Sequence, residues 1–114
     1  MDVIEVDERD SGWEDDGPRF RVHLWTTPGH ACWTYDITGA DVLEVVRWAQ
    51  VQAGDDRLYG IALVVDALRT TGDVERGLVW LLGMDANDPS DTDDASRRRA
   101  GMHARRGRRI VADG

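Results

Sequence analysis

Alternating apolar and polar side chains predict a β-hairpin in the first third of the chain. In residues 19–27, Phe20, Val22 and Leu24 share one face of an extended strand, and residues 31–37 alternate in the same way. A turn sequence containing Pro28-Gly29 lies between the two stretches. Folding the chain about this turn sets Leu24 opposite Trp33. A slip of one residue would mix the two faces, so the pattern predicts this register.

An apolar stripe at helical spacing follows the hairpin. Its members recur at intervals of three and four residues: Val42, Val45, Val46, Ala49 and Ala53. We expect Thr38 to cap the helix, with Asp41 three residues later in a short form of the capping box, and Gly54 to end it. Gln50 falls off the stripe and is predicted on the polar face.

Two later stretches, residues 58–65 and 78–82, are apolar on both faces. Such runs are typical of central strands that are covered on both sides. Residues 67–76 between them predict a loop with one helical turn. The chain is therefore expected to have an α+β fold of order ββαββ, in which one helix packs on one face of a mainly antiparallel four-stranded sheet.

One helix covers only one face of such a sheet, so the apolar side chains of the second face need another cover. The N-terminal arm, the C-terminal segment or a second copy of the chain can supply it. We expect a non-catalytic protein-interaction domain that self-associates through the open sheet face, as a homo-oligomer, or that binds a protein partner. Tryptophan and arginine concentrate in binding hot spots, although tryptophan also covers thin cores. The interface candidates are Arg21, His23, Trp25, Trp48 and Trp80.

Charge divides the chain into two blocks. Residues 1–94 contain 7 Arg and 21 acidic residues, whereas residues 95–114 contain 7 Arg and 1 acidic residue. Together with composition, this split predicts an acidic N-terminal arm (1–18), an α+β domain (19–86) and an acidic, then arginine-rich C-terminal tail (87–114). We expect disordered or weakly helical tails, with an edge strand over residues 3–6 as the alternative for the arm.

The arginine-rich tail supports an alternative function, nucleic-acid binding as an accessory protein. Guanidinium groups suit phosphate contacts, and the candidates are Arg97, Arg98, Arg99, Arg105, Arg106, Arg108 and Arg109. Against this, the acidic domain repels a polyanion, and no aromatic residue is interleaved with the arginines for base stacking. The tail can equally lie on its own acidic domain.

Side-chain chemistry gives no catalytic, metal or cofactor motif. A zinc site built on the neighbouring His23, His30 and Cys32 lacks a fourth ligand and a paired spacing. Aspartates at predicted strand ends cap turns more often than they catalyse, and the three here are Asp36, Asp66 and Asp85. We therefore expect no enzyme activity and no cofactor.

Cysteine usage and hydropathy predict a cytoplasmic protein. The single cysteine, Cys32, has no internal partner for a disulfide. No apolar run approaches the ~20 residues of a membrane helix, and the acidic start lacks the basic residues of a secretory signal. No membrane association is expected.

Three segments carry a shared pattern of core residues: residues 19–25, residues 36–45 with Trp48-Ala49, and residues 77–85. In this order they resemble a group of small uncharacterised proteins of actinobacteria and their phages. The likeness spans about residues 19–85 and leaves out both tails. It implies a shared compact domain and brings no activity, cofactor or site residue with it.

Overall fold

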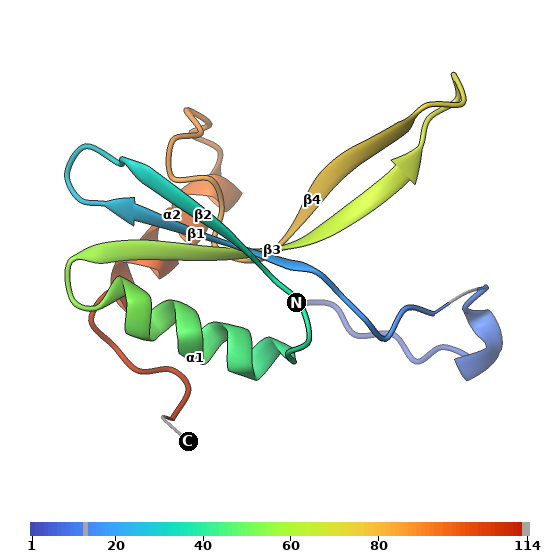
Figure 1. The fold of residues 1–114 in the computed structure, drawn as a ribbon, viewed down its shortest axis with the longest axis horizontal. Helices are drawn as coiled ribbons and strands as arrows, with labels where there is room; N and C mark the ends of the chain where they lie inside the picture. The colour runs from blue at the N-terminus through green and yellow to red at the C-terminus, as the bar shows by residue number, and fades with distance from the viewer. Residues whose placement is uncertain (13, 113–114) are drawn as a thin grey trace.

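A computed structural model describes residues 1–12 and 14–112. Strands β1 (Phe20–Thr26), β2 (Cys32–Ile37), β3 (Arg57–Leu68) and β4 (Val74–Leu82) form one antiparallel sheet in the order β2-β1-β3-β4. Helix α1 (Val42–Ala53) covers one face, and helix α2 (Asp93–Arg105) lies on the other (Figure 1). The short 3-10 helix η1 (Glu8–Asp10) lies in the N-terminal arm. The α+β class is confirmed, with a second helix that the predicted order lacked.

The predicted hairpin register is confirmed. Phe20 pairs with Ile37 and Leu24 with Trp33, so the apolar residues of β1 and β2 share the face that α1 covers. The residues between them, including His23 and Trp25, therefore point to the opposite face. This division decides which candidate residues each helix covers.

Helix α1 begins one turn later than predicted. Its N-cap is Asp41, whose side chain accepts from the Glu44 backbone N–H while the Glu44 carboxylate accepts from the Asp41 backbone N–H, a complete capping box. Thr38 is therefore not the cap. The predicted end is correct, because Gly54 takes a positive φ of 60° as C-cap.

The main core lies between α1 and the sheet. The apolar stripe of α1 packs on side chains from β1 and β3, and the buried members are Phe20, Val22, Leu24, Val45, Val46, Ala49, Ala53, Tyr59 and Ile61. The apolar side chains that recur at helical spacing in α1 and at every second residue in the strands thus pack against each other in one layer.

The C-terminal segment folds, so its expected disorder or weak helicity is wrong for residues 93–105. The Thr92 side chain caps α2 by accepting from the Ala95 backbone N–H. Ala95 and Met102, two turns apart, are buried against Trp25 and Leu58 on the second face of the sheet. Apolar residues are few in α2, but they lie on one side of the helix. Packing of that side against the sheet stabilises the helix more than the low helix propensity of its sequence destabilises it.

Strands β3 and β4 extend further than predicted and replace half of the expected loop, so that only residues 69–73 connect them. The pairing of β1 with β3 ends at Phe20↔Leu63, whereas β3 and β4 remain paired as far as Leu68↔Val74. Cross-strand ion pairs join Asp66 to Arg76 and Arg69 to Glu75, each at 3.1 Å. The result is a two-stranded ribbon, here called the distal ribbon (residues 64–79), which projects beyond both helices (Figure 1).

Candidate interaction surfaces

Three candidate residues form one aromatic cluster beneath α2. The ring of His23 stacks on Trp25 at a centroid distance of 5.4 Å and meets Trp80 at 4.9 Å. A Cβ on Gly60 would lie only 3.0 Å from Trp80 and 3.2 Å from Trp25, so glycine lets both indoles lie against the strand backbone. Trp25 is only 1% exposed. Trp25 therefore belongs to the core and is not an exposed interface anchor.

Burial in this cluster affects the titration of His23. Desolvation lowers the pKa of the imidazole from its usual 6.5, and the negative charge of Asp85 acts in the opposite direction. The neutral ring is therefore the favoured form in the folded protein. The cluster has a structural role, because it packs between α2 and the sheet.

Arg21 is held on the sheet by its cross-strand neighbour Asp36. Its Nε donates to Asp36 Oδ1 at 2.7 Å, and its second guanidinium nitrogen donates to Oδ2 at 3.0 Å. This bidentate hydrogen bond is the main cause that lowers the pKa of the Asp36 carboxyl. The pair fixes β1 against β2, which leaves Arg21 less available to a partner than predicted.

Trp48 lies on the other side of the sheet, beside the edge strand β2. Its ring meets Tyr35 edge to face at 5.3 Å, and the Arg57 guanidinium lies 5.2 Å from the centre of the Trp33 ring. Trp33 and Tyr35 are exposed. The candidates Trp48 and Trp80 are thus partly buried on opposite faces, and the structure does not bring them together.

Several of the tail arginines contact the protein itself. Arg98 forms an ion pair with Asp94 at 3.1 Å, Arg99 donates to the Asp88 carbonyl, and Arg106 donates to Thr27 Oγ1 at 3.0 Å. Arg97 is exposed on α2. The self-docking that sequence analysis gave as an alternative therefore describes much of this segment.

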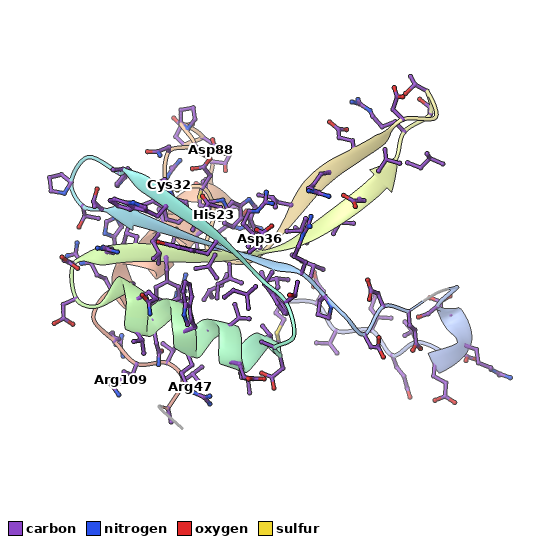
Figure 2. The ribbon with its side chains drawn as sticks, viewed as in Figure 1. His23, Cys32, Asp36, Arg47, Asp88 and Arg109 are labelled. Atoms are coloured by element: carbon purple, nitrogen blue, oxygen red, sulfur yellow. The ribbon has the colours of Figure 1, made fainter. Side chains whose placement is uncertain are left out.

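Beyond α2, the C-terminal strap (residues 106–112) returns to α1. Gln50 Oε1 accepts from the Ile110 and Val111 backbone N–H groups at 3.0 and 3.2 Å, and Gln50 Nε2 donates to the Val111 carbonyl. Arg47 Nε donates to the Ala112 carbonyl at 2.8 Å. Figure 2 shows Arg47 and Arg109 on the α1 side, away from His23 and Asp36. The prediction that Gln50 lies on the exposed face is wrong, because this amide holds the strap.

A groove of about 270 Å³ runs between the edge strand β4 and α2. Residues 80–83 line one side of the groove, and Arg97, Arg98 and Arg105 line the α2 side. Strand pairing passes from Ile61↔Leu82 to Ala62↔Trp80, so Leu81 is the extra residue of a β-bulge. No strand of the described chain pairs with the outer edge of β4. Sequence reasoning missed this groove because it did not predict α2.

Apolar side chains are exposed along the distal ribbon. Leu68, Val74 and Val79 are exposed there, and Leu81 is exposed where the ribbon joins the sheet, beside the groove that α2 lines. The predicted open second face of the sheet is wrong at its base, because the C-terminal segment covers it through Ala95 and Met102 of α2.

Acidic and metal-ligating side chains are dispersed or engaged. Asp66 pairs with Arg76, Asp85 accepts from the Asn87 backbone N–H at 2.9 Å, and Asp36 binds Arg21. Cys32 is exposed, with its Sγ 3.7 Å from Thr34 Oγ1. Within residues 1–12 and 14–112, no three His, Cys, Asp or Glu side chains gather as a metal site would require.

Comparisons with known proteins identify no relative of this chain. No family model matches it, and no curated protein or solved structure matches it significantly. Neither of the described helices is long and apolar enough to cross a membrane.

Proposed function

We propose that the protein is a non-catalytic interaction domain that self-associates through the distal ribbon and the free edge of β4. The observation that carries the proposal is the projection of this ribbon past both helices with Leu68, Val74 and Val79 exposed. Because α2 covers the base of the second sheet face, the proposal places the contact on this ribbon and on the edge of β4.

Two physical arguments support association at this place. A two-stranded ribbon alone is marginally stable in water, so a third strand beside it is stabilising. An unpaired edge also presents backbone N–H and C=O groups in register for another chain. The ion pairs across the ribbon set Asp66 against Arg76 and Arg69 against Glu75, which limits repulsion between two copies of a chain whose net charge is −8.

A charged substitution on the ribbon tests the proposal. Val79 on β4 is 51% exposed, and Val51 on the outer side of α1 is 54% exposed, so the two valines form a matched pair. We expect sedimentation over about 1–100 µM to show a dimer for the wild type and for Val51→Lys. We expect Val79→Lys to dimerise at least about tenfold more weakly, the equivalent of about 1.4 kcal/mol.

Two outcomes contradict the proposal. The first is a wild-type protein that stays monomeric over the whole concentration range. The second is a Val79→Lys variant whose dimer is as tight as that of Val51→Lys. Circular dichroism of both variants checks that each retains the wild-type fold.

A second candidate function is nucleic-acid binding through the arginines of α2 and the strap. Exposed Arg97 and Arg108 favour it. The contacts of Arg98, Arg99 and Arg106 with the protein reduce the positive charge that is available to phosphate groups. Self-association therefore has the better support. Binding of DNA or RNA at about 50 mM salt that weakens steeply with added salt would favour this second function.

A further inference from the structure

The groove between β4 and α2 has the chemistry of a peptide-binding site. The unpaired backbone edge of β4 lies beside the groove, and Arg97, Arg98 and Arg105 of α2 line its other side. Arg98 is held by a single ion pair with Asp94 that remains half-exposed. An extended segment with carboxylates on one face and apolar residues on the other would pair with the edge, turn its carboxylates toward the arginines and set its apolar residues on the α1 side of β4.

Residues 4–7 of this chain have that pattern. In an extended conformation, Ile4 and Val6 lie on one face with Asp2, and Glu5 and Asp7 lie on the other with Val3. Val3, Ile4 and Val6 are among the most exposed large apolar residues of the structure. The segment therefore gains burial for Ile4 and Val6 and a partner for Glu5 when it pairs with the β4 edge. The Asp7 carboxylate accepts from Arg9 within the arm and exchanges this partner for an arginine of α2.

We propose that residues 2–7 of one copy add as a strand to the β4 edge of a second copy. Glu5 and Asp7 face Arg97 and Arg98, while Ile4 and Val6 lie on the opposite face beside Val79. This inference rests on the proposed function, because it names the segment through which self-association occurs.

The position of the arm favours a second copy over the same molecule. The arm joins β1, and residues 14–19 line a crevice with residues 63–66 on the β1 side of β3. The β4 edge lies on the other side of β3, and Figure 1 shows the arm leading from β1 out to η1 before it turns back toward the sheet. Two copies that exchange arms each fill the other's groove, which gives a closed two-fold dimer.

Charge reversal on both sides of the contact tests the proposal with the full chain. One variant carries Glu5→Arg and Asp7→Arg, and the other carries Arg97→Glu and Arg98→Glu. We expect each variant alone to self-associate at least about tenfold more weakly than the wild type, because like charges then meet in the groove. An equimolar mixture should recover a heterodimer, since each arm then meets a groove of opposite charge.

A matched control separates this contact from a general effect of net charge. Glu14→Arg with Asp16→Arg changes the net charge equally in the same arm and should leave the dimer affinity within about twofold of the wild type. Two results would show that this inference is wrong while the proposed function stands, provided that the wild type dimerises. In the first, the arm variant and the groove variant each dimerise as tightly as the wild type. In the second, their mixture gives no heterodimer. A monomeric wild type overturns both.

Discussion

At the scale of single residues, Gln50 holds the C-terminal strap on α1. It is 7% exposed, and its amide makes three hydrogen bonds with the backbone of Ile110 and Val111, as acceptor from both N–H groups and as donor to the Val111 carbonyl. A buried amide is stabilising only when its partners are present, and here they come from a segment about 60 residues away in sequence.

Gln50→Ala should therefore lower the free energy of unfolding by about 1–3 kcal/mol, because the strap N–H and carbonyl groups lose their partners. Urea denaturation measures the loss, and hydrogen exchange at Ile110 and Val111 should accelerate. Gln52→Ala, on the exposed side of the same helix, should change stability by less than about 0.5 kcal/mol. Equal stability of the two variants would show that the strap contributes nothing to the fold.

His23 links stability to pH. Its pKa in the folded protein is lowered below 6.5, so the unfolded chain binds the proton first as the pH falls. The stabilising effect of the neutral ring is complete above pH 6.5 and declines at lower pH toward the folded pKa. Calorimetry should show a smaller drop in Tm between about pH 7.5 and pH 5.5 for His23→Phe than for the wild type. An unchanged drop would contradict this, and the exposed His103→Gln variant serves as the control.

At the scale of elements, α2 depends on very few apolar contacts. Met102 is 2% exposed and packs with Ala95 over Trp25 and Leu58. The unbranched thioether fills the irregular space beside the indoles, where a smaller side chain would leave a cavity.

Met102→Ala should lower the free energy of unfolding by about 2–5 kcal/mol through this cavity. His103→Ala changes the next, exposed residue and should cost less than about 0.5 kcal/mol. Urea denaturation followed by circular dichroism compares the two. If the two variants unfold at the same urea concentration, α2 does not form part of the cooperative unit.

Elements with a regular pattern could be predicted from sequence, and elements that depend on remote contacts could not. The register of β1 and β2 and the stripe of α1 follow from periodicity alone. Helix α2 could not be predicted, because two buried residues among arginines give no apolar stripe. The sequence of residues 67–76 predicts a loop, because the pairing of Leu68 with Val74 and of Asp66 with Arg76 is set by the register of the strands before them.

At the scale of the whole molecule, the same reasons explain how much of the candidate surface could be predicted. The sequence indicated more apolar side chains on the two sheet faces than one helix can cover, and some of them are exposed on the distal ribbon. Trp25 was assigned to the right strand face, but its burial could not be foreseen without α2. The groove between β4 and α2 arises only when residues 80–83 meet residues 97–105, a juxtaposition that no local pattern encodes.

The position of Trp25 and Trp80 side by side beneath α2 has a practical consequence. Two of the five indoles sit where displacement of a single helix would admit water to them. The chain thus carries an intrinsic optical reporter, whose emission wavelength and quenching follow the docking of its arginine-rich helix without any attached dye.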